Sequence, residues 1–455
     1  MSSTTDLTTG SLPKKILIFS LPLMFSNILQ VLFNMADVAV VGRFAGAYAL
    51  GAVGSTSILV MLFTGFLIGM GNGVNVLTAR FYGARKERDV KETVHTSLII
   101  CLITGVIILV VGIAFARGLL ELLNTKDELI DGATLYLRIY FVGMPAMAIY
   151  NFGSGVLSAV GDTKKPLYYL LTAGIINVVL NLFFVIVCEL DVAGVSLATV
   201  ISQYISATLI LHALFKSKEM YGLSLAGFGG VHHGINCNTF SKEKAISLLV
   251  LGVPAGVQNA IFAVANLFIQ ASVNSFDATM VSGNAAAANS DGLVYEVMAA
   301  FYVACASFIG QNYGAGKKDR ILKSYFVCLA YSFGVGAILG GGLLIWGRQF
   351  LGLFTTETAV IESGMLRLQI MAFSYAVSAF MDCTIAAARG LGKSLVPTII
   401  VVMGSCVFRI VWIYTIFATY RTITSLYLLY IFSWSITAIA AIVYFAWCYR
   451  KVGGK

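Results

Sequence analysis

Long runs of apolar residues, separated by short polar or glycine-rich links, constrain this chain more than any other sequence feature. A helix that crosses a bilayer needs ~20 mostly apolar residues. The runs of about this length cover 16–41, 48–76, 94–116, 132–158, 166–188, 192–214, 245–273, 280–309, 324–346, 361–387, 395–418 and 424–448. Only 11% of the residues are charged, whereas soluble domains carry roughly 25%. The sequence therefore predicts an all-α polytopic membrane protein with twelve transmembrane helices.

The Lys and Arg residues indicate which side of the membrane each link faces. Most of the 30 lie in alternate links, on the side that also holds both termini. Links rich in Lys and Arg face the cytoplasm, so we expect both termini to be cytoplasmic, in a cell inner or plasma membrane. The net charge of +9 follows from these links and does not indicate a nucleic-acid partner.

The two halves of the sequence repeat each other. The matched pairs include 82–86 with 313–317, Pro22 with Pro254, Asn27 with Asn259 and Asn34 with Asn266. Between Asn34 and Tyr82 the first half holds one residue more than the second half holds over the matching interval. Each half has six runs, an even number, so both halves enter the membrane from the same side and the repeats are parallel.

This repeat predicts two six-helix bundles. We expect an amino-terminal lobe over 1–215, a cytoplasmic linker loop over 216–244 and a carboxyl-terminal lobe over 245–455. Two bundles joined by one loop favour alternating access, in which a central cavity opens to one side of the membrane at a time.

The first apolar run carries the most informative polar residues. Asn27, Gln30, Asn34 and Asp37 are spaced by three, four and three positions, which places them on one stripe of a helix with ~3.6 residues per turn. The stripe should face protein or a water-filled cavity, because lipid contact would be costly. Pro22 precedes it and predicts a kink or hinge. Asp37 is the expected substrate or ion site, and a polar seam that only joins helices is the alternative.

Other runs offer partners for Asp37. Asn177 and Asn181 are four residues apart and share a helix face. Thr199 belongs to a polar face of the sixth run, and Tyr136 lies near the outer end of the fourth. If these side chains converge, they form an oxygen-rich site for a proton or a small hard cation such as Na+. For each partner, a packing seam stays open as the alternative.

The second half offers a weaker set of polar positions. They are Gln258, Asn259, Asn266, Asp291, Glu296 and Asp382. Ile269 stands where Asp37 would fall in the repeat, so the acidic position is not duplicated. Each of the three acids could contact a cationic substrate or only pair helices. Arg409 could balance one of them, and the sequence does not choose its partner.

No arrangement of residues typical of a catalytic site occurs in the sequence. The glycine-rich stretch 69–73 lies within an apolar run and lacks a P-loop lysine, so its glycines predict close helix packing. Without a nucleotide-binding motif, either an ion gradient drives the protein or there is no energy coupling at all. We expect no enzyme activity, no cofactor beyond H+ or Na+ as coupling ion, and no metal beyond Na+ at Asp37.

Several stretches in both halves form a distinctive set. They are Asn34-Met35-Ala36-Asp37, Val41-Gly42-Arg43, Gly161-Asp162-Thr163-Lys164-Lys165-Pro166, 177–181, 194–203, Gly310-Gln311-Asn312-Tyr313-Gly314 and Arg389-Gly390-Leu391-Gly392. With them the chain resembles the bacterial branch of the multidrug and toxic-compound extrusion (MATE) family over essentially all twelve runs.

This resemblance implies a V-shaped pair of lobes and export of mainly cationic amphiphiles against H+ or Na+. It also implies that Pro22 and Asp37 are the kinking proline and the acid of the amino-lobe cation site, with Tyr136, Asn177 and Thr199 as further members. Many members of the family carry aspartate where this chain has Asn181. Some also have a glutamate in the seventh helix, which this chain lacks.

Three functions compete at this point. The leading one is a cation-coupled exporter of small cationic or amphiphilic drugs or toxic compounds, acting as a monomer in the lipid bilayer. A flippase for lipid-linked saccharides, from the same superfamily, is the second. A channel or receptor is the third, although the internal repeat argues against a receptor.

The distribution of basic residues predicts the orientation of the chain. Tags at either terminus or in the 216–244 loop should react only with reagents that reach the cytoplasm, because the Lys- and Arg-rich links resist translocation. Labelling of single cysteines with a membrane-impermeant maleimide, in intact cells and in everted vesicles, measures this. Labelling of the loop in intact cells would contradict the orientation.

Overall fold

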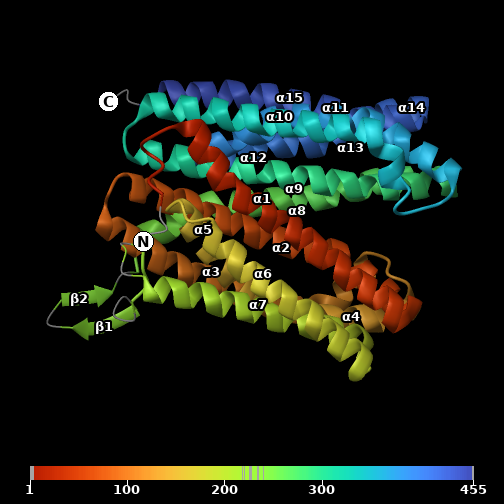
Figure 1. The fold of residues 1–455 in the computed structure, drawn as a ribbon, viewed down its shortest axis with the longest axis horizontal. Helices are drawn as coiled ribbons and strands as arrows, with labels where there is room; N and C mark the ends of the chain where they lie inside the picture. Colours follow the sequence, from red (N-terminus) through yellow and green to blue (C-terminus); the bar gives the residue numbers. More distant parts are fainter. Residues whose placement is uncertain are drawn as a thin grey trace. The chain divides into compact units, whose positions relative to one another are not determined.

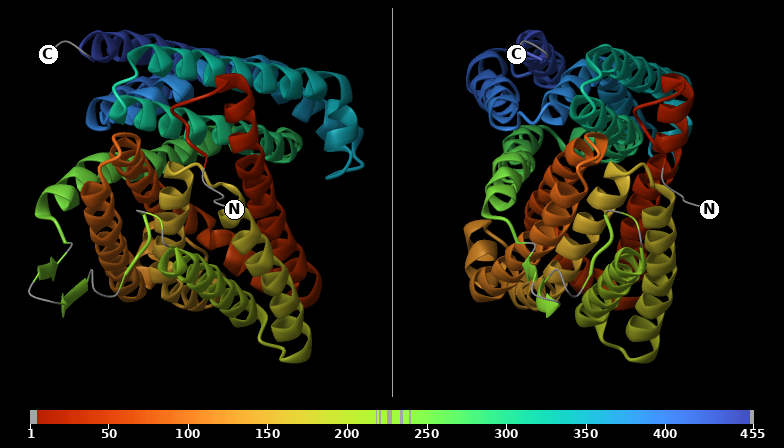
Figure 2. Two further views of the ribbon diagram at one scale, coloured as in Figure 1. Left: turned by 60° about the vertical axis from the view of Figure 1, so that its left-hand side comes forward. Right: turned by 90° about the vertical axis from the view of Figure 1, so that its left-hand side faces the viewer.

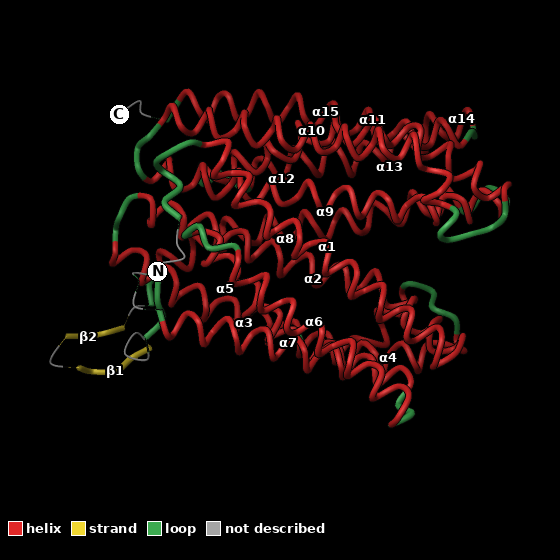
Figure 3. The backbone as a smooth tube through the Cα atoms, viewed as in Figure 1, coloured by secondary structure: helices red, strands yellow, loops and turns green. Residues whose placement is uncertain are grey.

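The computed structural model describes residues 5–217, 219, 221–224, 228–232, 235–238 and 240–452. Helices dominate this part of the chain, and Figure 3 shows only short loops between them. The one sheet of the described residues is a two-stranded antiparallel ribbon of β1 (Phe228–His232) and β2 (Ile235–Asn238). It falls in the linker predicted over 216–244, of which residues 218, 220, 225–227, 233–234 and 239 lie outside the described residues.

Seven α-helices precede the ribbon, and two five-residue π-helical turns interrupt the series. The elements are α1 (Leu12–Val40), η1 (Val41–Ala45), α2 (Gly46–Gly83), α3 (Glu87–Leu122), α4 (Asp127–Val142), α5 (Met144–Ala159), α6 (Lys164–Leu182), η2 (Phe183–Val187) and α7 (Asp191–Lys216).

Further helices follow the ribbon, and the helical stretch from Leu395 to Tyr420 is interrupted by two π-helical turns. The elements are α8 (Lys242–Val273), α9 (Ala278–Gly314), α10 (Lys318–Leu351), α11 (Thr358–Gly390), α12 (Leu395–Val401), η4 (Val402–Val407), α13 (Phe408–Trp412), η5 (Ile413–Phe417), α14 (Ala418–Tyr420) and α15 (Ile423–Arg450).

The helices match the apolar runs of the sequence. Ten helical stretches of the described residues are long and apolar enough to cross a membrane, and the pair α4 and α5, bent by 46°, makes an eleventh. One stretch, Leu12–Gly83, has 72 residues and at ~1.5 Å per residue would be about 110 Å long, far more than the ~30 Å hydrocarbon core. It therefore crosses twice, as α1 and α2, which confirms the prediction of twelve crossings.

The chain divides into two compact units, and two helices have one part in each unit. One unit contains Phe25–Ala260, and the other contains Leu7–Met24 together with the chain from Ile261 onward. Both α1 and α8 are therefore shared between units, and each contains one of the repeated prolines, Pro22 or Pro254. The lobe boundaries expected at 215 and 245 stay a prediction, because the contact-based units differ from them in these two segments.

Within the second unit, α10, α11 and α15 run side by side (Figures 1 and 2). The start of the chain is anchored to this unit by hydrogen bonds. The backbone N–H of Leu7 donates to Gln311 Oε1 at 3.1 Å, and Lys317 Nζ donates to the carbonyl oxygen of Thr8 at 2.8 Å. Lys317 ends the repeated stretch 313–317 and Gln311 lies two residues before it, so this part of the turn between α9 and α10 holds the amino-terminal segment.

The glycine-rich stretch 69–73 packs helix against helix in the first unit, as predicted. A Cβ atom added at Gly69 would lie 2.3 Å from the backbone nitrogen of Gly256 on α8. Gly73 and Gly252 approach as closely, with 2.8 Å between an added Cβ and the backbone. Small residues at these positions let the backbones of α2 and α8 touch, which is how transmembrane helices gain dispersion energy without a hydrophobic driving force.

We expect Gly69→Ala and Gly54→Ala, both within α2, to change stability in opposite directions. At Gly69 the added methyl group meets backbone 2.3 Å away, and such overpacking costs typically about 1–3 kcal/mol. At Gly54 nothing lies within 4 Å of the added atom, so Ala should stabilise the helix by roughly 0.5–1 kcal/mol. Thermal unfolding of the two variants in detergent measures the difference. Equal unfolding temperatures would contradict the close packing of α2 on α8.

Candidate cation site

The ends of three helices meet around Asp37 in the first unit. α1 and α6 each run directly into a π-helical turn, η1 after Val40 and η2 after Leu182. The i→i+5 bonding of a π turn widens the helix locally, and such turns occur frequently at functional sites. The two turns contact each other and α7. This arrangement brings Asp37 of α1, Asn181 of α6 and Thr199 of α7 together.

A hydrogen-bonded network joins the predicted residues. Asn181 Nδ2 donates to Asp37 Oδ1 and, at 3.3 Å, to Asn177 Oδ1. Asn177 Nδ2 donates to Thr199 Oγ1 at 3.4 Å. Asn177 and Asn181 are buried, and Asp37 is half-buried. The spacing of four puts the two asparagines on one helix face, where Asn181 contacts the carboxylate of Asp37 directly and Asn177 contacts Asn181 and Thr199.

The network contains more acceptors than donors. Thr199 Oγ1 lies 3.0 Å from the carbonyl oxygen of Val195 and 3.5 Å from Asp37 Oδ2, and its single proton serves one acceptor at a time. Asn181 Oδ1 is buried and accepts no hydrogen bond from the described residues. A buried acceptor without a donor costs about 1–3 kcal/mol. A positively charged partner placed among these oxygens would remove that cost.

The chemistry of the oxygens fits a small hard cation or a proton. Carboxylate, amide and hydroxyl oxygens are the ligands that hard cations take in proteins, and Asp37, Asn181 and Thr199 supply one of each. One carboxylate contributes one negative charge, so a single positive charge neutralises the group. The residues therefore suit H+ or a monovalent ion such as Na+ better than a divalent metal.

Two buried tyrosines of α4 border this network. The rings of Tyr136 and Tyr140 stack with centroids 5.8 Å apart, and both phenols interact electrostatically with Asp37. The side chain of Gln203 lies near the hydroxyl of Tyr140. Gln203 lies one turn after Thr199 on α7 and so extends the same polar face. Gln203 belongs to the polar face that the sequence predicts for this helix, together with Thr199, Ser202 and Ser206.

The rest of the polar stripe on α1 extends away from the network. Asn34 is one turn from Asp37, and Gln30 and Asn27 lie about 10 and 15 Å away along the axis at ~1.5 Å per residue. Asn34 and Gln30 are exposed, and Asn27 is half-buried. The structure therefore brings Asp37 to the predicted partners and leaves the other three residues outside the hydrogen-bonded network.

The polar residues early in α8 serve helix packing in the first unit. Asn259 Nδ2 donates to the carbonyl oxygen of Gly65 on α2 at 2.9 Å. Gln258, the residue before Asn259, is buried. Asn259 therefore joins α8 to α2, which favours the packing alternative for this residue over a place in a substrate cavity.

The remaining lower-ranked residues lie in the second unit. Asn266 on α8 is exposed, whereas Glu296 on α9 and Asp382 on α11 are half-buried. In the described part of the chain, no three His, Cys, Asp or Glu side chains gather into a potential metal site. These residues are thus dispersed over three helices and form no counterpart of the Asp37 network.

Arg409 is surrounded mainly by aromatic rings. Its guanidinium lies 4.8 Å from the ring centroid of Tyr430 and 5.7 Å from that of Trp434, and its Nε donates to Ser433 Oγ at 3.3 Å. Asp382 attracts it electrostatically. No ion pair joins Arg409 to an acid among the described residues, so its contacts are the aromatic rings and Ser433.

A second buried charge pair was not predicted from the sequence. Arg367 on α11 donates to Asp291 on α9 and, at 2.7 Å, to Asn284 Oδ1. Tyr375 donates to Asp291, and Tyr427 donates to Asn284 Oδ1 at 2.9 Å. This network connects α9, α11 and α15, so Asp291 pairs helices rather than standing free for a substrate. Two opposite charges within neighbouring apolar runs were the available signal.

Comparison with known proteins places the chain among membrane transporters. The MatE family model matches residues 22–183 and, a second time, 254–415, which agrees with the predicted repeat. The probable multidrug resistance protein YoeA of Bacillus subtilis is 28% identical over 387 residues, covering 84% of this chain and 82% of that protein. The probable multidrug resistance protein NorM of Thermotoga maritima is 25% identical over 399 residues, covering 85% and 82%.

The fold is also found among solved structures. A transporter of the MOP superfamily from Pyrococcus furiosus matches with a TM-score of 0.89 and 23% sequence identity over 99% of both chains. At this identity the likeness concerns the fold, and it confirms the all-α membrane architecture predicted from the apolar runs.

We expect Asn181→Leu to destabilise the protein more than Asn34→Leu. The first change removes the amide that bridges Asp37 and Asn177 and leaves buried polar atoms unpaired, at a cost of about 1–3 kcal/mol. The second makes the same substitution at an exposed position of the stripe. Thermal unfolding in detergent measures both. If Asn34→Leu loses as much stability as Asn181→Leu, the hydrogen-bonded network makes no specific contribution to the stability of the fold.

Proposed function

The chain belongs to the MatE family, and we propose that it is a secondary active exporter of small cationic or amphiphilic compounds, driven by inward movement of H+ or Na+. The observation that carries the proposal is the excess of buried acceptor oxygens around Asp37. The names of the curated relatives, which are multidrug resistance proteins, favour an exporter over a flippase or a channel.

In this proposal Asp37 binds the coupling ion. Without a cation, the carboxylate is held by the amide of Asn181 and, at a longer distance, by the hydroxyl of Thr199. A proton or Na+ would be held by the carboxylate of Asp37, and the unpaired Asn181 Oδ1 would supply a further oxygen ligand. Occupancy then removes the net charge of the site and lowers the cost of closing it away from water.

Ion binding would act on transport through α1. This helix contributes Asp37 to the first unit and its first half, Leu12–Met24, to the second. We propose that Pro22 is the hinge between these parts, because proline leaves one backbone hydrogen bond unmade within the helix. An ion that binds one arrangement of α1 more tightly shifts the equilibrium between inward- and outward-facing states. Substrate then leaves by alternating access of the two lobes.

The proposed orientation of the chain in the membrane sets the direction of transport. Both termini lie in the cytoplasm, as the positive-inside rule indicates, and the protein works as a monomer in the inner or plasma membrane. Substrates enter from the cytoplasm or the membrane and leave on the opposite side. The multidrug resistance attributed to relatives by name makes drugs and toxic compounds the first substrates to test.

Asp37→Asn tests the function directly. The change keeps the size and hydrogen bonding of the side chain but fixes its charge at zero, so the variant should fold and bind substrate without coupling. Coupling free energies are typically ~1–3 kcal/mol, or roughly 5- to 150-fold, and gradient-driven transport should fall by a factor in this range. Uptake of a fluorescent cationic dye by everted vesicles, with an imposed H+ or Na+ gradient, measures it.

The matched control is Asp131→Asn, which changes an exposed carboxylate paired with Arg117 at the surface. It should transport as the unmodified protein does. Normal gradient-driven transport by Asp37→Asn would make Asp37 a structural residue, and the coupling site would then be sought at Glu296 or Asp382. Dye uptake without any gradient dependence would argue for a channel instead.

A further inference from the structure

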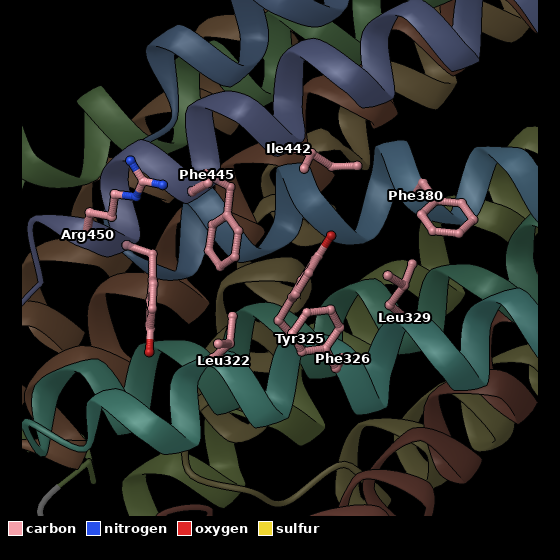
Figure 4. Close-up of a pocket in the computed structure, with 10 residues that line it drawn as sticks. Leu322, Tyr325, Phe326, Leu329, Phe380, Ile442, Phe445 and Arg450 are labelled. Carbon is pink, nitrogen blue, oxygen red and sulfur yellow. The ribbon is translucent and has the colours of Figure 1, made fainter.

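The second unit carries an apolar groove that is far in sequence from the Asp37 network. It has a volume of about 410 Å³ and is formed by α10, α11 and α15. Figure 4 shows Leu322, Phe326 and Leu329 of α10 facing Ile442 and Phe445 of α15, with Phe380 of α11 at one end and Arg450 at the other. The groove is thus hydrocarbon along its length and basic at one end.

The hydroxyl of one lining residue, Tyr325, is occupied by a hydrogen bond within the protein. The hydroxyl of Tyr325 is hydrogen-bonded to Thr384 Oγ1 at 2.8 Å, and its ring contacts that of Phe445 with centroids 4.8 Å apart. Phe326 keeps 56% of its surface exposed and Ile442 keeps 37%. A fixed, aromatic wall with exposed apolar side chains favours a flexible hydrocarbon ligand.

The basic end of the groove holds charges without acidic partners. Arg450 is exposed and lines the groove, and Lys318 Nζ lies 5.2 Å from the ring centroid of Tyr449, which also lines it. Neither Arg450 nor Lys318 forms an ion pair with a carboxylate within the described residues. Two cations near one mouth of an apolar groove match an anionic head group.

The length of the groove limits what can fill it. From Ile442 to Arg450 on α15 the axial distance is about 12 Å at ~1.5 Å per residue. The hydrocarbon of one leaflet is about 15 Å thick, half of the ~30 Å core. A lipid chain from a single leaflet fits this length, whereas a transmembrane helix of a second copy would need an apolar face about twice as long.

We propose that the groove between α10 and α15 binds one anionic phospholipid. Its phosphate lies between Arg450 and Lys318, and one acyl chain follows Phe445 and Phe326 toward Phe380. The guanidinium of Arg450 suits phosphate oxygens because its donors match them in pairs. This site is separate from the proposed coupling at Asp37, and it would exist whether or not the protein exports drugs.

Native mass spectrometry of the full chain tests the proposal. The protein is released from nanodiscs that contain equal amounts of phosphatidylglycerol and phosphatidylcholine with identical acyl chains, and the bound lipid is counted. We expect one phosphatidylglycerol to be retained preferentially. In the double variant Arg450→Gln with Lys318→Gln, the preference should fall roughly tenfold, because each basic residue near an anionic head group contributes attraction.

Three controls separate the alternatives. Lys164→Gln removes a charge from an exposed lysine of the first unit and should leave the retained lipid unchanged. Ala446→Trp fills the groove and should lower retention of both lipids, while excess glycerol phosphate without acyl chains should not displace the bound lipid. Equal retention of the two lipids by the unmodified protein, equal loss in Lys164→Gln, or a dimer in place of bound lipid would overturn the proposal.

Discussion

A carboxylate placed among helices in a membrane must be matched by donors or by a positive charge, and the first unit is organised around this requirement. Asp37 receives an amide proton from Asn181 and shares the hydroxyl of Thr199 with a backbone carbonyl. These partners hold the charge without fully satisfying it. The site therefore stays receptive to a cation, whereas the Asp291–Arg367 pair of the second unit is already neutral.

The two units are not linked only by the loop between them. One part of each shared helix, α1 or α8, belongs to the first unit and the other part to the second. A change of conformation in one part of α1 can therefore be transmitted to the other part. α8 is fixed to α2 by backbone contact at Gly69 and Gly256 and by the hydrogen bond from Asn259. Both helices contain a proline, Pro22 or Pro254, but α1 also runs into the π turn η1, so it is the shared helix with the less regular backbone.

The sequence predicted what depends on length and periodicity. Apolar runs of bilayer length located the crossings, and helical spacing put Asn177 and Asn181 on the face that meets Asp37. The pairing of Asp291 with Arg367 depends on how α9 and α11 rotate against each other, which no spacing within one helix encodes. The same limitation applies to Arg409, whose aromatic neighbours come from several helices. For Asn27, Gln30 and Asn34, periodicity correctly placed the residues on one stripe with Asp37. It could not tell that only the Asp37 end of the stripe reaches the hydrogen-bonded network.

The π turn η1 has a consequence for the history of the repeat. The first half is one residue longer than the second between Asn34 and Tyr82 and their counterparts Asn266 and Tyr313, and η1 lies within this interval. Over the matching interval, the described residues of α8 and α9 contain no π turn. A π turn holds one residue more per hydrogen-bonded ring than an α turn. A single inserted or deleted codon accounts for the difference in length, and it lies in an interval where the first half forms η1 and the second half forms a loop over 274–277, between α8 and α9.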